Sequence, residues 1–362
     1  MNNRRFVQVV VGGTAAVLVL AAGTTVVLDP FFHYHKPLEG VEYPLEDGME
    51  RYLNDGIIKT YDYDAAIVGT SMMQNFKASQ FDRLFGTKSI KVTYTAETYY
   101  VIDQEARKVL RENPDTKYIF RCLDYNKVFQ AGEVRNYDGY PDYLYDDNIF
   151  NDVNYVLNKE IFLDNTVGVI EYNSEGKETT SMDDYSFWEW EHPVGKEHVM
   201  ESYERREEAV SGQKAFTDAD RQTVIDNVTE NVIRTVEENP DTTFIFYTPL
   251  YSVAFWDDAE RSGDLIRYFE AEKLQAELLL PYDNVKLYSF SDHYDIAQNL
   301  DNYMDPTHYG SEISDMIIDW IYEEEGLLTE DNYVEKIQAM EDYYLSFDYD
   351  SIFGDMDDEN AE

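Results

Sequence analysis

Two distant segments of the chain share a pattern in which a helix stops and a short apolar strand follows. Residues 107–116 end in Asn-Pro-Asp-Thr before the apolar run 117–120, and residues 233–242 end the same way before 243–246. Proline cannot continue a helix and restricts the residue before it, so each Asn-Pro-Asp is expected to end a helix. Repeated helix–strand units favour a parallel sheet with helical crossovers. The chain is therefore expected to be an α/β protein.

Three further runs of small and branched apolar residues extend this pattern. Residues 64–69, 89–94 and 283–290 are strand candidates, and the first of them is typical of a strand covered on both faces. Residues 97–111 and 311–325 favour helices. In the second helix, apolar residues recur at helical spacing and are expected to face the sheet: Met316, Ile317, Trp320 and Ile321.

The amino-terminal residues predict a membrane anchor. Residues 6–28 carry no charge and follow Arg4 and Arg5. About 23 residues at about 1.5 Å rise span roughly 35 Å, enough to cross a bilayer core. A cleaved signal peptide is the alternative, because residues 20–23 are small, but the apolar run continues beyond them. The arginines favour a cytoplasmic tip over residues 1–5, so we expect a single-pass protein of the cell membrane with its bulk extracellular.

Charge and cysteine content exclude some partners. The net charge of −44 comes from 73 acidic and 29 basic residues, so nucleic acid and anionic surfaces are unfavourable partners. An aromatic content of 15% argues against disorder. The single cysteine, Cys122, cannot form an intramolecular disulfide and is expected in the core, which suits a bacterial envelope.

The chain divides into regions by composition. We expect a juxtamembrane connector over 29–60, an α/β domain over 61–328 with an insertion at about 127–215, and a carboxy-terminal helix with an acidic tail over 329–362. An insertion of this length is often a lid or substrate platform. It contains closely spaced aromatic residues that suit stacking on sugar rings or, equally, packing of its own small core: Tyr137, Tyr140, Tyr143, Tyr145, Phe187, Trp188 and Trp190.

Three residues point to acyl-ester chemistry. Ser71 follows the predicted strand 64–69, and Asp305 and His308 lie just before the predicted helix 311–325. The histidine can take the serine proton, and the aspartate can hold the imidazole in the required tautomer. Each residue also has a simpler explanation, since Ser71 could cap a helix, Asp305 could form a turn, and His308 could be a surface residue. Other histidines lack an aspartate three residues earlier: His192, His198 and His293.

This order of motifs resembles the SGNH, or GDSL-like, hydrolases. Among them it is most similar to membrane-anchored envelope members that act in O-acylation of cell-wall or exopolysaccharide glycans. The resemblance covers about residues 60–325 and implies a three-layer parallel sheet of SGNH or flavodoxin-like type. It also implies that Ser71 is the nucleophile, His308 the general base and Asp305 its orienting partner.

The resemblance extends less fully to the oxyanion hole. The family uses the serine N–H, a glycine after the second strand and an asparagine after the third. Here Ala96 occupies the first of these later positions and Asn126 the second, and Thr70 stands where the family usually has aspartate. A backbone N–H of Ala96 can serve equally well, because that donor is main chain.

These observations lead to one expected function and one alternative. The first is a membrane-tethered serine esterase or O-acetyltransferase that acts on an envelope glycan through an acyl-serine, with no metal or organic cofactor. The alternative is a non-catalytic binding protein of the same fold that serves an envelope polymer assembly system. Expected partners are thus the membrane, a glycan and envelope assembly proteins. Two histidines of the connector, His33 and His35, cannot close a metal site without further ligands and are expected to be interfacial.

Overall fold

The computed structural model describes residues 3–45, 48–146 and 148–359. By their contacts these residues form two compact units. The first comprises the described parts of Met1–Asp62 and Asp138–Ser186, and the second those of Tyr63–Tyr137 and Phe187–Glu362. The ends of the expected cytoplasmic tip and acidic tail, residues 1–2 and 360–362, lie outside the described residues. Each unit therefore combines two stretches of chain that are distant in sequence.

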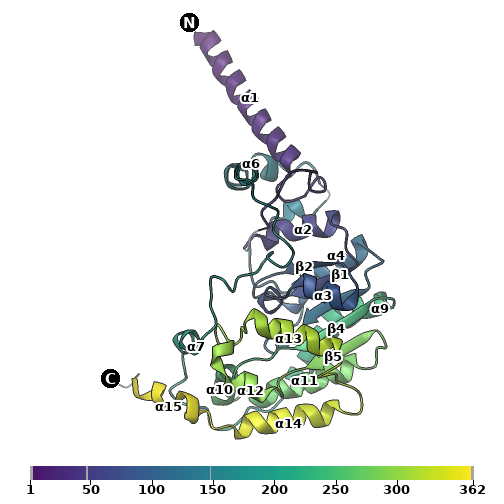
Figure 1. Cartoon of the computed structure of the whole chain (residues 1–362), viewed down its shortest axis with the longest axis vertical. Helices are drawn as coiled ribbons and strands as arrows, with labels where there is room; N and C mark the ends of the chain where they lie inside the picture. The colour runs from purple at the N-terminus through teal and green to yellow at the C-terminus, as the bar shows by residue number, and fades with distance from the viewer. Residues whose placement is uncertain (1–2, 46–47, 147, 360–362) are drawn as a thin grey trace. The chain divides into compact units, whose positions relative to one another are not determined.

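The second unit contains the parallel sheet that the sequence predicts. Its strands run in the order β2-β1-β3-β4-β5, and every neighbouring pair is parallel (Figure 1). Both Asn-Pro-Asp segments end helices as expected, with Asn113 and Asn239 as the carboxy-terminal caps. The strands are β1 (Ala65–Gly69), β2 (Ser89–Thr93), β3 (Tyr118–Cys122), β4 (Thr243–Thr248) and β5 (Val285–Ser289).

Helices and short turns connect these strands. The α-helices of the second unit are α3 (Ala78–Phe85), α4 (Tyr99–Glu112), α7 (Lys196–Ser202), α8 (Asp218–Val228), α9 (Arg234–Glu238), α10 (Val253–Ser262), α11 (Leu265–Leu279), α12 (Tyr294–Gln298), α13 (Ser311–Tyr322), α14 (Tyr333–Ser346) and α15 (Asp350–Glu359). The remaining elements are the 3-10 helices η1 (Ser71–Met73), η2 (Lys127–Phe129) and η6 (Leu300–Asn302), and the π-helical η5 (Thr229–Ile233), which joins α8 to α9.

The buried face of α13 differs from the expected one. Ile317 and Ile321 are buried, as predicted, but Met316 is 39% exposed and Trp320 is only partly buried. The buried face of α13 also includes Ile313, one helical turn before Ile317, and Ile318, the residue after Ile317. The prediction for Met316 was wrong because the spacing of four apolar residues did not define which side of the stripe faces inward.

The strand order creates a switch point between β1 and β3. The chain moves from β1 to β2 on one side and then returns to β3 on the other side of β1. In open parallel sheets, ligands bind outside the carboxyl ends of the strands at such a point. Ser71 follows β1 and Asp124 follows β3, so both lie at this edge.

The first unit is helical. Its elements are α1 (Asn3–Leu28), α2 (Glu50–Thr60), η3 (Asp142–Leu144), α5 (Val153–Val156), the π-helical η4 (Ile161–Thr166) and α6 (Val167–Ser174). Among the described residues, α1 is the one helix long and apolar enough to cross a membrane, and a signal sequence would share these properties. Its orientation across a membrane stays a prediction.

A buried carboxylate joins α1 to the rest of the first unit. Asp29 lies directly after α1 at a φ of +44° and is fully buried. Its carboxylate accepts hydrogen bonds from the backbone N–H groups of His33 (3.0 Å), Tyr34 (2.7 Å) and His35 (3.0 Å), and from the Tyr155 hydroxyl (2.8 Å). The end of the helix is therefore held by several bonds at one residue.

One unit boundary, at Asp62/Tyr63, lies close to the expected end of the connector at residue 60, while the boundaries at Tyr137/Asp138 and Ser186/Phe187 differ from the expected insertion bounds. Much of the expected connector 29–60 and the stretch 138–186 of the expected insertion belong to the same unit. Hydrogen bonds between side chains and backbone join the two stretches; for example, the backbone N–H of Glu42 donates to Asn173 Oδ1 at 2.9 Å. Tyr155 and Tyr185 are fully buried there, so part of the aromatic content packs a local core. A glycan-binding role for the other aromatic residues stays a prediction.

Candidate active site

Ser71 opens a tight turn at the carboxyl end of β1. A Cβ atom at Gly69 would lie 2.3 Å from Met73 Cγ, so glycine is needed for the chain to turn here. Thr70 is the N-cap of η1, and its hydroxyl accepts a 3.4 Å hydrogen bond from the N–H of Met72. The alternative explanation of Ser71 as a helix cap is therefore wrong, because its neighbour has that role. Ser71 itself stays partly exposed.

The structure brings Ser71, His308 and Asp305 into direct contact. Ser71 Oγ lies 2.7 Å from His308 Nε2, and His308 Nδ1 lies 2.6 Å from Asp305 Oδ2. The other oxygen, Asp305 Oδ1, accepts hydrogen bonds from the backbone N–H groups of Thr307 (2.8 Å) and His308 (2.9 Å). The turn from Asp305 to His308 thus holds the carboxylate of Asp305 in hydrogen-bonding contact with the imidazole of His308. This geometry is that of a nucleophile, a base and an orienting acid.

The electrostatics of Asp305 favour its ionised form. Burial raises the pKa of this carboxyl, but the hydrogen bond and charge of His308 outweigh burial. The backbone N–H groups of Thr307 and His308 lower it further, and the resulting pKa is about 2. An ionised Asp305 is able to stabilise a positive charge on the neighbouring imidazole of His308.

The lowered pKa of Asp305 links folding stability to pH. Its folded pKa of about 2 lies below the ordinary value of 3.8, so the ionised group stabilises the fold above about pH 4. That contribution is lost as the pH falls toward 2, and solvent screening of a side chain that is 31% exposed limits it to about 1–2 kcal/mol. Asp305→Asn should therefore lower the free energy of urea unfolding at pH 7 and have a progressively smaller effect below pH 4. A difference that stays constant down to pH 2.5 would contradict this assignment.

A buried carboxylate lies behind Thr70, the residue that precedes Ser71. Asp124 Oδ2 accepts a 3.0 Å hydrogen bond from Thr70 Oγ1, and Asp124 Oδ1 accepts a 2.9 Å bond from the hydroxyl of Tyr251. Burial raises the pKa of Asp124, while the two hydroxyls, Lys127 and His308 oppose that rise. The carboxylate therefore supports the residue that precedes Ser71. Sequence reasoning missed this role, although the position of Asp124 directly after a strand was a usable signal.

Removing the Asp124 carboxylate should destabilise the second unit. Asp124→Ala leaves the buried hydroxyls of Thr70 and Tyr251 without their acceptor, at an expected cost of about 2–4 kcal/mol in the free energy of unfolding. Asp124→Asn keeps an acceptor oxygen and should cost less. Chemical denaturation followed by tryptophan fluorescence measures both, with the exposed Asp115→Ala as control. Equal stability of Asp124→Ala and Asp115→Ala would show that the network contributes nothing.

An aromatic ring lies against the imidazole. The ring centroids of Trp188 and His308 are 4.9 Å apart, at an interplanar angle of 87°. The backbone N–H of Trp188 donates a 3.1 Å hydrogen bond to Asn75 Oδ1. An edge-to-face ring at this distance restricts the imidazole to its present orientation. The sequence predicted that this tryptophan could stack on sugar rings or, equally, pack a small core of the insertion. No spacing rule connects it to a histidine 120 residues away.

A cavity of about 430 Å³ lies beside these groups in the second unit. Trp188 and Asp305 form part of its wall, together with His192, His198 and Met304. Its acidic residues, including Glu191 and Glu201, give it a polar rim. Ser71 and His308 are not among its lining residues, so the cavity borders the Asp305 end of the Ser71–His308–Asp305 contact.

The two residues predicted for the oxyanion hole, Ala96 and Asn126, follow the strands β2 and β3. Ala96 follows β2 at a φ of +55°, and its carbonyl accepts hydrogen bonds from Lys127 Nζ (2.9 Å) and Asn136 Nδ2 (2.7 Å). Asn126 follows β3 and is exposed. Roles of Ala96 and Asn126 in an oxyanion hole stay predictions.

The remaining histidines of the second unit make different contacts. His293 stacks on Trp320 with ring centroids 4.0 Å apart, and His192 meets Trp188 at 5.3 Å. His198 Nε2 lies 3.8 Å from a carboxylate oxygen of Glu197. Of the histidines that the structure describes, His308 is the one hydrogen-bonded to Ser71.

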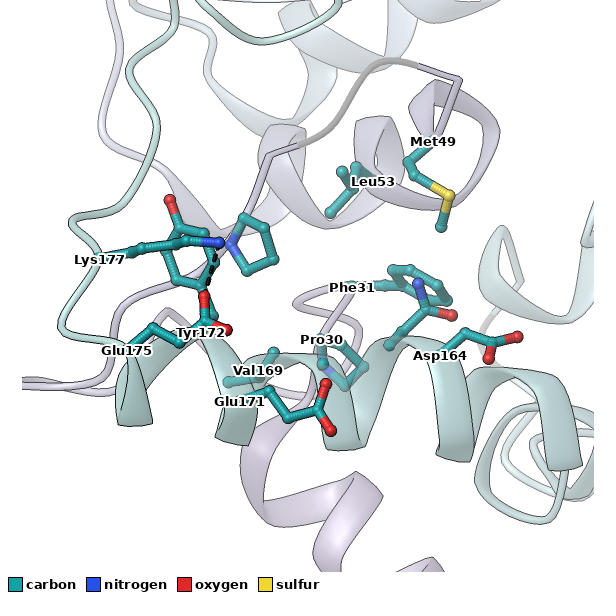
Figure 2. Close-up of a pocket in the computed structure, with 13 residues that line it drawn as sticks. Pro30, Phe31, Met49, Leu53, Asp164, Val169, Glu171, Tyr172, Glu175 and Lys177 are labelled. Carbon is teal, nitrogen blue, oxygen red and sulfur yellow. Dashed lines mark ion pairs between the residues drawn. The ribbon is translucent and has the colours of Figure 1, made fainter.

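A second cavity, of about 210 Å³, lies in the first unit (Figure 2). Its floor is apolar, with Phe31, Leu53 and Val169, and its acidic lining includes Asp164 and Glu171. It holds no serine–histidine pair. Across residues 3–45, 48–146 and 148–359, no group of three or more His, Cys, Asp or Glu side chains is arranged to hold a metal ion.

Comparison with known proteins does not assign a family. No protein-family model matches the chain, and none of the curated proteins compared with it is significantly similar. The function is therefore inferred from the residues of the site.

Proposed function

We propose that this chain is a membrane-tethered serine acyl-ester enzyme of the SGNH type with a three-layer α/β domain. Its substrate is an O-acyl ester on a cell-envelope glycan or exopolysaccharide, and its site faces the extracellular side. One observation carries the proposal: Ser71 Oγ is 2.7 Å from His308 Nε2, while the far nitrogen of that ring contacts an ionised Asp305. Ser71 lies more than 230 residues before the turn that carries Asp305 and His308, and the contacts between the two segments support acyl transfer.

The reaction proceeds through an ester on Ser71. Ser71 Oγ attacks the carbonyl carbon of the substrate ester as its proton passes to His308 Nε2. The tetrahedral intermediate collapses, the bond to the alcohol oxygen breaks, and that oxygen takes the proton from Nε2. The acyl group is then attached to Ser71, and the sugar or other alcohol leaves.

The second half of the reaction decides between hydrolysis and transfer. Water or a sugar hydroxyl attacks the acyl-Ser71 carbonyl and gives its proton to His308 Nε2. The carbon–oxygen bond to Ser71 breaks, and the serine recovers that proton. Backbone N–H groups of Ser71 and Ala96 and the amide of Asn126 are proposed donors to the oxyanion; losing one such donor typically costs about a hundred- to a thousandfold in rate.

The setting of the site supports an envelope substrate. A helix long and apolar enough to cross a membrane precedes the catalytic unit, which favours a substrate held at or near a membrane. The net charge of −44 disfavours polyanions and is compatible with neutral or cationic glycans. Trp188 lies against His308 and also forms part of the wall of the cavity that Asp305 lines, where an aromatic face suits a sugar ring.

A soluble ester tests the proposed activity. The full-length chain in detergent should release p-nitrophenol from p-nitrophenyl acetate, with a burst of one equivalent if deacylation is slow. Adding oligosaccharide acceptors should move the acetyl group from water to sugar if the chain is a transferase. Absence of release above the Ser71→Ala background would contradict an acyl-ester enzyme.

The second candidate is a non-catalytic binding protein on the same fold. It is favoured by two positions that depart from the family pattern, Thr70 and Ala96. Such a protein would bind an O-acylated glycan with unchanged affinity in Ser71→Ala and would turn none of it over. Binding and turnover measured on the same glycan separate the two candidates.

A further inference from the structure

The first unit exposes large apolar side chains outside its long helix. They lie within residues 149–170, and their exposed fractions range from 44% to 88%. We refer to them together as the apolar surface: Ile149, Phe150, Val153, Leu157, Leu163 and Ile170. Six large exposed apolar side chains within 22 residues are more than the single exposures that occur on most protein surfaces, so this stretch is a candidate contact surface.

The elements that carry the apolar surface pack against the end of α1. Both α5 and η4 contact α1 directly. Thr25 of α1 is fully buried, and its hydroxyl lies 3.1 Å from that of Thr166 at the end of η4. The Tyr155 hydroxyl of α5 donates to Asp29. The apolar surface is thus tied to the last turns of the long helix.

The length of α1 indicates where the elements attached to its end lie relative to the hydrocarbon core of a bilayer. Arg4 and Arg5 are expected to stay out of the hydrocarbon core, so the core begins near Phe6. About 20 residues at about 1.5 Å rise fill a core of about 30 Å. A core that begins at Phe6 therefore ends close to Thr25, which is where η4 is attached. The elements with the apolar surface lie at the far edge of the core.

We propose that the apolar surface inserts into the interfacial layer of the same bilayer that α1 crosses. The partner is lipid, because the surface continues directly from a helix suited to lipid and lies at the depth of the interface. Insertion is driven by burial of apolar side chains and not by attraction to anionic headgroups. The charged residues of the stretch are three carboxylates and one lysine: Asp152, Glu160, Asp164 and Lys159.

One helix offers a matched pair of positions. Ile170 of α6 is 49% exposed and belongs to the apolar surface. The next residue, Glu171, points another way along the helix and lines the cavity in Figure 2. Consecutive helical residues point about 100° apart, so one helix presents both a lipid-facing and a water-facing position. This inference does not depend on the catalytic proposal.

Site-specific fluorescence tests the insertion. The full-length chain is placed in phosphatidylcholine nanodiscs, one copy per disc, with an environment-sensitive probe on Phe150→Cys, Ile170→Cys or Glu171→Cys. The native Cys122 is buried, and the unsubstituted chain measures background labelling. We expect blue-shifted emission and quenching by acyl-chain-brominated lipid at residues 150 and 170, with water-like emission and little quenching at 171.

Three results would overturn the proposal. The first is water-like emission at residues 150 and 170 that brominated lipid does not change. The second is quenching that requires anionic lipid and disappears at high salt, since that would indicate electrostatic adsorption. The third is protection of the two probes only in discs that hold two copies, which would assign the surface to a second chain.

Discussion

Replacing His308 with alanine should lower kcat for ester hydrolysis by about a thousandfold or more. Its ring nitrogen is the group 2.7 Å from Ser71 Oγ, and no other described histidine is hydrogen-bonded to that serine. Without it the hydroxyl stays protonated and is a weak nucleophile. Initial rates on p-nitrophenyl acetate give the change in kcat and KM separately. KM should change little, because the ring acts on the proton and not on binding.

The control is a histidine that lies elsewhere in the same unit. His293→Gln alters a ring that stacks on Trp320 and should leave kcat within a few-fold of the unsubstituted chain. Combining His308→Ala with Ser71→Ala should add little to either single effect, because the two residues act as one unit. Additive losses would contradict a shared proton transfer.

Replacing Asp305 with asparagine should lower kcat by about a hundred- to ten-thousandfold. Asp305 Oδ2 lies 2.6 Å from His308 Nδ1, and in the proposed mechanism the carboxylate stabilises the imidazolium that forms when Ser71 attacks. An amide keeps the shape but carries no charge, and its NH₂ group can select the wrong tautomer. Steady-state kinetics at several pH values measure the loss.

The matched control for this variant is Asp301→Asn. Asp301 lies four residues earlier, and its carboxylate accepts from the backbone N–H of Lys196, not from an imidazole. We expect near-unchanged kcat for Asp301→Asn. Similar losses in both variants would mean that the turn tolerates no change and that Asp305 has no special electrostatic role.

The parallel sheet was predictable because its signals are local. Proline after Asn113 and Asn239 ends each helix whatever the rest of the chain does, and short apolar runs then have few alternatives to strands. The site followed from the same reasoning: strand ends of a parallel sheet meet at one edge, so Ser71 after β1 was expected there. Contact with His308 depended on a late turn reaching that edge, which the motif order anticipated.

Other features depend on contacts that sequence reasoning does not reveal. The backbone N–H of Leu45 donates to Thr180 Oγ1 at 2.7 Å, across 135 residues, and such bonds make one unit from two distant stretches. Composition placed the insertion at about 127–215, whereas the units change at Tyr137/Asp138 and Ser186/Phe187, because composition registers polarity and not pairing. Trp188 beside His308 depends likewise on tertiary packing.

A covalent adduct tests the central claim most directly. The full-length chain is treated with a fluorophosphonate and digested, and the peptides are mapped by mass spectrometry. We predict one phosphonylated residue, Ser71, with labelling abolished in Ser71→Ala and greatly slowed in His308→Ala. A folded chain in which Ser71 stays unmodified at every concentration of reagent would contradict an activated serine and favour a binding protein.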